Sequence, residues 1–338
     1  MGQLVKPKVF FVGVTEVYEQ GLKDYLEYTG QMEFWPVYLQ ARAEGLTSGE
    51  ALCSVYAKMC YKSLVVGKNA NVTKVRDVQK NLEGCHDTGH GSVFEHCQLN
   101  FIVTDCSRVY THEQVRHRIG WSYSQTSGRY CRLDKIDLVW SDLLDPVKDL
   151  WLKGLTYIED LVYLTECKLG LRKPNPANPD SSPERCLYYR DNAGSLEIPH
   201  GLAEQHKWVP DDTFNFDKRK AITSAIRRIA PNGQSNEIGM SCNIRSLRST
   251  VQVRTARFAE TEIRDIFNQV FHIVRSRFPT IFYKARTKEI GGFLEVYGMK
   301  TQPFELTAGD PAALEWLPSE VLRAELFARD AEARVTAG

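Results

Sequence analysis

A basic segment in the first half of the chain gathers residue types that bind anions. Residues 116–118 read Arg-His-Arg, and residues 127–129 read Ser-Gly-Arg after a polar interval. Neighbouring guanidinium groups repel one another, so an anionic ligand is the simplest reason to gather them, and arginine offers a fixed fork of donors that matches phosphate. Hydroxyl groups before Gly-Arg suit a loop around an oxyanion, because glycine lets backbone amides approach. A solvated helix end is the alternative, since cations at a helix C-terminus are mildly stabilising.

A second polar set lies further along the chain. Arg227 ends one expected helix, Asn243 opens another, and Arg254 follows that helix. Arg245 and Ser249 are one helical turn apart and therefore share a face. This mixture of amide, hydroxyl and guanidinium groups indicates recognition of a base or a cofactor. Solvent-facing arginines are the alternative.

The histidines and cysteines favour no metal site and no thiol nucleophile. His86, His90 and His96 resemble a zinc signature, but Gly89 weakens the helix that would have to present two of them on one face. Ordinary hydrogen-bonded histidines are the favoured interpretation, and we predict no metal. The 9 cysteines include no Cys-x-x-Cys pair, and we expect most of them to be buried as small apolar residues.

Composition excludes some classes of protein. The 338 residues carry a formal net charge of +1, whereas nucleic-acid and membrane-surface proteins usually show a clear basic excess. No apolar run approaches the length of a membrane helix, and no secretory signal begins the chain. The sequence therefore predicts a soluble cytoplasmic protein that binds neither nucleic acid nor a membrane.

The elements that must position these residues can be predicted from periodicity and capping. Residues 8–14 and 99–103 are expected strands, and helices are expected from Ser48 and from about Thr73 to Leu82, stopping near Gly84. Ser107 is a good N-cap for a helix through Arg118, which would put the Arg-His-Arg triplet in its last turn. Gly120 would then end that helix.

The second half of the chain is mostly helical in pattern. Helices are expected at about residues 145–170, 218–229, 243–251 and 259–278, the last with one continuous apolar face. Prolines punctuate residues 172–217, which we interpret as an insertion or a long irregular loop. A C-terminal helix is expected from Ser319.

Four segments, in the same order along the chain, resemble the motifs of the flavin-dependent thymidylate synthases. They are residues 90–96, 107–115, 116–130 and 243–254, and the last match continues through residues 259–264. The resemblance covers about residues 48–132 and 220–285. Four motifs in register make it highly specific.

The resemblance implies a fold and a domain organisation. The implied class is α/β (α+β), a mixed sheet packed with helices, in a homotetramer whose sites are shared between subunits. Residues 1–290 would form a single catalytic domain with a proline-rich insertion at about 172–217. Residues 291–338 would form a C-terminal extension that ends in a helix.

The reaction implied by the resemblance is methylation of dUMP at C5 to give dTMP. Methylene-tetrahydrofolate would supply the carbon, FAD would carry the hydride, and NADPH would reduce the flavin. The nucleotide and the folate are thus the expected small-molecule partners. This chemistry needs no enzyme thiol, in agreement with the cysteine pattern.

The resemblance also assigns roles by position. The expected flavin contacts are His90, Ser92, Arg116, His117, Arg118, Asn243, Arg245 and Ser249. The expected nucleotide contacts are Glu113, Gln125, Ser127, Gly128, Arg129, Arg227 and Arg254. Arg254 would be the catalytic residue, because a cation against the pyrimidine stabilises the N3-deprotonated form and so activates C5.

Two departures from the family pattern bear on specificity. The interval between the Arg-His-Arg triplet and Ser127 is one residue longer than usual, around Trp121, and Glu113 stands where glutamine is common. A carboxylate would be repelled by a phosphate. Glu113 would therefore accept a hydrogen bond from a sugar hydroxyl or orient an arginine.

These departures leave room for an altered nucleotide preference or transferred group. The same fold could act on another pyrimidine nucleotide such as dCMP, or transfer a hydroxymethyl group. A module that binds single-stranded nucleic acid through Trp121, Tyr123 and Tyr130 is the alternative from another class.

Overall fold

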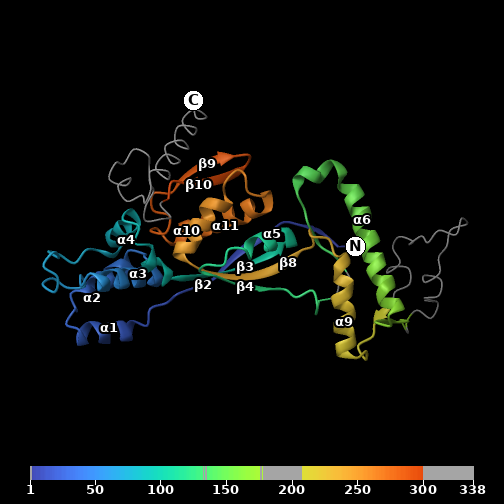
Figure 1. Ribbon diagram of the computed structural model, residues 1–338, viewed down its shortest axis with the longest axis horizontal. Coiled ribbons are helices and arrows are strands. Elements are labelled where there is room, and N and C mark those ends of the chain that lie inside the picture. The colour runs from blue at the N-terminus through green and yellow to red at the C-terminus, as the bar shows by residue number, and fades with distance from the viewer. Residues whose placement is uncertain (1, 132, 134, 176, 178–207, 300–338) are drawn as a thin grey trace, which may run out of the picture.

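The computed structural model describes residues 2–131, 133, 135–175, 177 and 208–299. At its centre, four strands form an antiparallel sheet in the order β2-β3-β8-β4 (Figure 1). They are β2 (Lys8–Val14), β3 (Gln98–Cys106), β8 (Asn236–Asn243) and β4 (Trp121–Gln125). The strand predicted at residues 8–14 is confirmed, and the one predicted at 99–103 lies inside β3.

Helices cover one face of this sheet. In Figure 1, α10 (Ile244–Arg254) and α11 (Thr261–Arg277) lie above it, with the short α5 (Arg108–Gln114) beside them. Alternate residues of β3, such as Leu99 and Phe101, are buried in this core. The predicted apolar face of α11 is confirmed, since each of its members is 0% exposed: Ile263, Ile266, Phe267, Val270 and Val274.

A hairpin completes the core above α11. It consists of β9 (Arg286–Ile290) and β10 (Phe293–Tyr297), which pair antiparallel. Val296 is 0% exposed in the same core as α11. The hairpin therefore spans the domain boundary predicted at residue 290.

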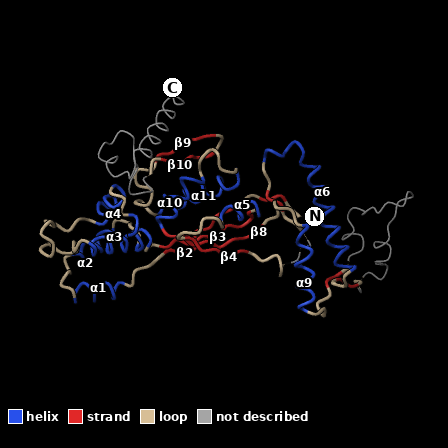
Figure 2. Tube along the Cα trace, in the orientation of Figure 1, coloured by secondary structure: helices blue, strands red, loops and turns tan. Residues whose placement is uncertain are grey.

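Four helices pack together at one end of the sheet (Figures 1 and 2): α1 (Glu19–Tyr28), α2 (Phe34–Ala43), α3 (Ser48–Cys60) and α4 (Val78–Asp87). Thr47 caps α3 in a capping box with Glu50, as the predicted start at Ser48 requires.

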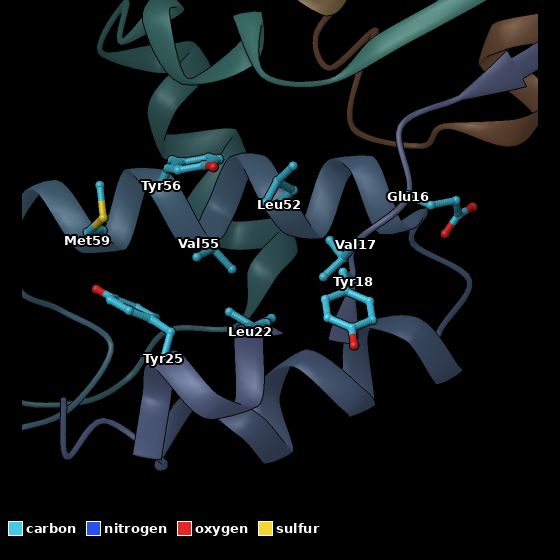
Figure 3. Close-up of a pocket in the computed structure, with 9 residues that line it drawn as sticks. All are labelled: Glu16, Val17, Tyr18, Leu22, Tyr25, Leu52, Val55, Tyr56 and Met59. Carbon is cyan, nitrogen blue, oxygen red and sulfur yellow. The ribbon is translucent and has the colours of Figure 1, made fainter. Parts of the chain in front are cut away.

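An apolar groove of about 330 Å³ runs between α1 and α3 (Figure 3). Leu22 and Val55 line it, and Tyr25 and Met59 lie together at one end. The groove contains no predicted site residue, so the candidate site lies elsewhere.

A smaller body stands at the other end of the sheet. It contains α6 (Lys148–Lys168) and α9 (Phe216–Ile226), which overlap the predicted helices at 145–170 and 218–229. It also contains the parallel pair β1 (Leu4–Val5) and β5 (Leu138–Val139) and the short pair β6 (Arg172–Lys173) and β7 (Val209–Pro210). Short 3-10 turns, η2 (Asp142–Val147) and η3 (Arg227–Ile229), flank the two helices.

The predicted α/β (α+β) class is confirmed, with parallel pairing between β1 and β5 and antiparallel pairing in the central sheet. Most of the proline-rich insertion and the C-terminal helix expected from Ser319 lie outside the described residues. None of the described helices is long and apolar enough to cross a membrane.

Two helix predictions were wrong at their ends. The helix expected from Thr73 begins instead at Val78, where the Asp77 side chain accepts the Lys80 amide, and it continues past Gly84 to Asp87. The helix capped by Ser107 ends at Gln114. The Arg-His-Arg triplet therefore lies in the loop after α5, and not in its last turn.

Candidate active site

The helix α5 begins at a doubly anchored cap. The Ser107 hydroxyl accepts the Tyr110 amide at 3.1 Å, so the predicted N-cap is confirmed. Glu262, at the start of α11, accepts from both the backbone amide and the hydroxyl of Ser107. These bonds fix the start of α5 and therefore the direction of Arg108 at one end and of Glu113 at the other.

The loop after α5 is fastened to the first turn of α10. The Asn243 side chain caps α10 by accepting the Ser246 amide at 2.8 Å. The Ser246 hydroxyl donates to the Ile119 carbonyl at 2.8 Å, and the Asn243 amide donates to the Gly120 carbonyl at 3.1 Å. Gly120 has a φ of +69°, so a left-handed residue makes the turn from the loop into β4.

Three side chains from separate elements meet at the end of α10. Arg254 donates through Nε to His117 Nε2 at 2.7 Å and through one terminal nitrogen to Glu113 Oε2 at 2.8 Å. The Glu113–Arg254 ion pair is partly buried, with 32% and 19% of the two side chains exposed. Glu113 thus orients an arginine, which is one of the two roles predicted for it.

His117 is held neutral in this group. Burial, assisted by the Arg254 cation, lowers its pKa from 6.5 to about 4. Because Nε2 accepts from Arg254, the ring proton is assigned to Nδ1. The backbone of His117 is also held, since the Tyr123 hydroxyl lies 2.7 Å from its carbonyl and 2.8 Å from that of Gln114.

A pair of arginines lies at the opposite end of α5. A side chain added at Gly128 would meet an Arg108 terminal nitrogen at 3.6 Å and Arg227 Cδ at 3.7 Å, so both arginines flank this glycine. Burial and the nearby Arg227 lower the pKa of Arg108. Neither guanidinium has a carboxylate partner among the described residues. Two neighbouring arginines with no ion pair among the described residues are suited to binding an anion.

Sequence reasoning missed Arg108. The signal was present, because Arg108 directly follows an N-cap serine and therefore sits in the first turn of a helix. Cations are mildly disfavoured there by the helix dipole, so an arginine in that place is a candidate for binding an anion.

The remaining nucleotide candidates lie on β4 and the turn after it. Gln125 donates to the Thr111 hydroxyl at 3.0 Å, which ties β4 to α5. The Ser127 hydroxyl accepts the Arg129 amide at 3.4 Å. The Arg129 side chain is exposed.

Three of the flavin candidates, His90, Ser92 and Arg245, lie at the 3-10 turn η1 (Gly91–Glu95). Arg245 pairs with Glu95 at 2.6 Å and lies against Gly91. The Tyr61 hydroxyl lies 2.8 Å from His90 Nε2. The other side chains are exposed and form no hydrogen bond with another described residue: Ser92, Arg116, Arg118 and Ser249.

The three histidines of the zinc-like pattern face different neighbours. His86 stacks on Phe94 with ring centroids 3.9 Å apart, and His96 stacks on Tyr56 at 4.0 Å, while His90 meets Tyr61. Within the described residues, no three His, Cys, Asp or Glu side chains are grouped to hold a metal ion.

The stacking platforms expected of a nucleic-acid module are not all available. Trp121 is 8% exposed and packs against Tyr123 and Phe267 in the core. The Tyr123 hydroxyl is occupied by backbone carbonyls. Of the three aromatic residues, only Tyr130 is an exposed side chain.

Comparison with known proteins identifies the family. A family model described as thymidylate synthase complementing protein matches residues 44–280. The flavin-dependent thymidylate synthase of Clostridium tetani is 27% identical over 233 residues, covering 69% of this chain and 80% of that protein. That of Mycobacterium tuberculosis is 25% identical over 234 residues, covering 69% and 78%.

Solved structures give a weaker match. The flavin-dependent thymidylate synthase ThyX of Helicobacter pylori, complexed with FAD and dUMP, is 18% identical. The match covers 67% of this chain and 92% of that one, with a TM-score of 0.39.

Gly120→Ala should destabilise the protein beyond the cost of a left-handed backbone. A Cβ at Gly120 would lie 2.2 Å from the Ser246 hydroxyl and 2.4 Å from the Asn243 side chain, so it would displace the cap of α10. Gly45 is the matched control, because its φ is +91° and nothing lies within 4 Å of an added Cβ. Both variants lose about 1–2 kcal/mol from the left-handed backbone, and Gly120→Ala should lose about 1 kcal/mol more from the cap. Equal losses in urea unfolding would contradict this packing.

Arg254→Met should raise the pKa of His117. Removing the cation leaves only burial to disfavour the imidazolium, so the histidine should titrate above its wild-type value of about 4. NMR titration of labelled histidines measures the change, and Arg257→Met serves as a nearby control that should leave His117 unaltered. In the wild type, the His117 contribution to stability should be lost as the pH falls from 6.5 toward 4, since the unfolded chain takes up the proton first. An unchanged His117 titration in Arg254→Met would rule out the contact.

Proposed function

This chain belongs to the thymidylate synthase complementing protein family, whose matched members are flavin-dependent thymidylate synthases, and we propose that it methylates dUMP at C5 to make dTMP. It is accordingly an enzyme of the methyltransferase class. In the proposed reaction, methylene-tetrahydrofolate is the carbon donor and NADPH the reductant. The observation that carries the proposal is the placement of a cation site at each end of α5.

The first of these sites suits the phosphate of the nucleotide. Arg108 and Arg227 flank Gly128, where a backbone amide can approach an oxyanion without hindrance from a side chain. Ser127 and Arg129 add a hydroxyl and a third guanidinium from the same turn. The phosphate would supply the negative charge that the paired arginines lack.

The second site suits the pyrimidine. A helix of seven residues spans about 10 Å, so α5 separates the two sites by roughly the length of a nucleoside monophosphate. Arg254 would stabilise negative charge on the ring after loss of the N3 proton, which makes C5 more nucleophilic. Glu113 and His117 hold that guanidinium in place, and the neutral His117 adds no competing positive charge.

The residues assigned to FAD fit a flavin dinucleotide. The Arg116 and Arg118 side chains are exposed and have no ion-pair partner among the described residues, so they can meet a pyrophosphate. Arg245, Ser249, Asn243 and Ser92, with His90, supply further polar groups on α10 and η1. When bound, FAD supplies the hydride that converts the transferred one-carbon unit into a methyl group.

Of the eight cysteines in the described residues, five are buried: Cys53, Cys85, Cys97, Cys106 and Cys242. Burial raises the pKa of Cys53 and of Cys106 to about 12, so neither is a ready thiolate. The proposed mechanism therefore activates C5 through Arg254 and uses no enzyme thiol.

We further propose a homotetramer in the cytoplasm with sites shared between subunits. Ile119 and Phe258 are 89% and 85% exposed in the segments next to His117 and Arg254. Apolar side chains exposed beside a site are suited to burial against another subunit.

The proposed function predicts a yellow protein whose NADPH oxidation depends on dUMP. The purified enzyme, supplied with FAD, dUMP, NADPH and methylene-tetrahydrofolate, should yield dTMP by mass. Arg254→Gln should lower the rate about 10²–10³-fold, as expected for loss of a donor that stabilises developing charge. A colourless preparation that takes up no FAD would contradict the proposal. A product formed from dCMP would change the assigned substrate, and a hydroxymethylated product would change the assigned transferred group.

Arg108→Met should weaken binding of dUMP and leave binding of deoxyuridine unchanged, because only dUMP carries the phosphate. A lost charged hydrogen bond of about 1.5–3 kcal/mol corresponds to a roughly 10- to 100-fold higher Kd. Arg277→Met, on the exposed end of α11, is the control for net charge. Equal effects on the nucleotide and the nucleoside, measured by calorimetry, would remove Arg108 from the phosphate site.

A further inference from the structure

A polar cavity of about 440 Å³ lies between the end of α3, the loop that follows it and α4. Three cationic side chains line it, Lys58, Lys74 and Arg76, and no described carboxylate does. Three asparagines, Asn69, Asn71 and Asn81, also line it. The cavity is therefore electropositive and rich in hydrogen-bond donors.

Lys58 carries a buried charge that forms no ion pair with any described residue. Its side chain is 1% exposed, and its ammonium donates to the Arg76 carbonyl at 2.7 Å. The nearby Asp77 is engaged elsewhere, since it caps α4 at the Lys80 amide and pairs with the Lys80 ammonium at 3.4 Å. Burial lowers the pKa of Lys58 from 10.5 to about 8. A buried cation is costly unless it is paired, and here the charge of Asp77 offsets only part of that cost.

The amides of the wall can donate to the same anion. Asn81 accepts the Ser54 hydroxyl through its oxygen, which leaves its NH₂ group without a partner among the described residues. The Asn71 side chain and the Lys74 ammonium likewise form no hydrogen bond with another described residue. Carboxylate and phosphate oxygens are the acceptors that match ammonium and amide donors together.

The cavity adjoins the flavin side of the candidate site. His90, expected to contact the flavin, lines it and meets the Tyr61 hydroxyl at 2.8 Å. Lys58 lies in the last turn of α3, and Tyr61 directly follows that helix. Both residues line the cavity together with His90.

We propose that this Lys58 cavity is an oxyanion subsite that receives the carboxylate or phosphate end of a co-substrate. The identity of the co-substrate depends on the proposed function, whereas the affinity for the anion does not. Two sources share the required chemistry: the glutamate carboxylates of the folate and the phosphates of NADPH. Both would reach the cavity past His90.

The first test measures anion binding without turnover. The thermal stability of the full-length protein is titrated with inorganic phosphate and with glutarate at constant ionic strength. Lys58→Met should raise the midpoint of the anion-dependent stabilisation at least about fivefold, whereas Lys58→Arg should keep it near the wild-type value. Lys62→Met is the matched control, because it removes the same charge four residues further on, just after α3, and Lys62 does not line the cavity. Since Arg108 and Arg227 also attract phosphate, the difference between Lys58→Met and Lys62→Met isolates the cavity.

A second variant tests the cavity independently, in case Lys58→Met fails to fold. Asn81→Asp keeps the shape of the side chain and its acceptor for Ser54, but puts a carboxylate on the cavity wall. It should abolish the phosphate and glutarate response of the cavity. Anion titrations that match the wild type in both Lys58→Met and Asn81→Asp would overturn the proposal and leave Lys58 as a structural residue.

Steady-state kinetics then identify the co-substrate. In Lys58→Met, a KM raised at least about fivefold for NADPH alone assigns the cavity to its phosphates, and a KM raised for the folate alone assigns it to the glutamate carboxylates. Unchanged values for both would refute the co-substrate assignment. If the wild type oxidises no NADPH, the proposed function fails, and the anion titration still decides whether the cavity binds oxyanions.

Discussion

The antiparallel pairing of β3 with β8 is the constraint that assembles the site. Each of these strands ends in a capping residue, Ser107 after β3 and Asn243 at the end of β8, and each cap starts a helix. Because Gln98 pairs with Asn243 at one end and Cys106 with Asn236 at the other, the two helices start at opposite ends of the sheet. They run toward each other over the same face. Seven residues of α5 and eleven of α10 span about 27 Å in total, close to the roughly 26 Å length of an eight-residue strand. The ends of the two helices therefore meet, and Glu113 contacts Arg254 there.

This geometry concentrates positive charge that the protein does not neutralise internally. Arg108 and Arg227 both lie beside Gly128, Arg254 is paired with the single carboxylate of Glu113, and the ammonium of Lys58 is buried without an ion pair among the described residues. Each arrangement costs folding free energy. Bound anions would offset that cost, because a ligand that binds only the folded state stabilises it. The requirement for several anionic ligands in one enzyme gives these cations a common explanation.

Capping and periodicity were reliable where the interaction is local. The cap at Ser107, the helix start at Asn243 and the apolar face of α11 were correct, because each depends on residues within one or two turns. The helix start at Thr73 was wrong, since Asp77 caps α4. Strand β4 was missed, since Trp121–Gln125 reads as a hydroxyl-rich loop and becomes a strand only by pairing with β8. The helix predicted through Arg118 stops at Gln114 because the loop after it is held by the first turn of α10.

Sequence by itself determined the family and the chemical character of the site, because the motifs keep their residue types, order and spacing whatever the chain around them does. Only the tertiary structure decided the partners: that Glu113 and His117 hold Arg254, and that Arg108 and Arg227 meet beside Gly128. The same holds for Lys58, which in the sequence is one polar position on an amphipathic helix and in the structure is a buried cation. The physical reason is that pairing and burial depend on residues distant in the chain, which meet only after the sheet and its helices have packed.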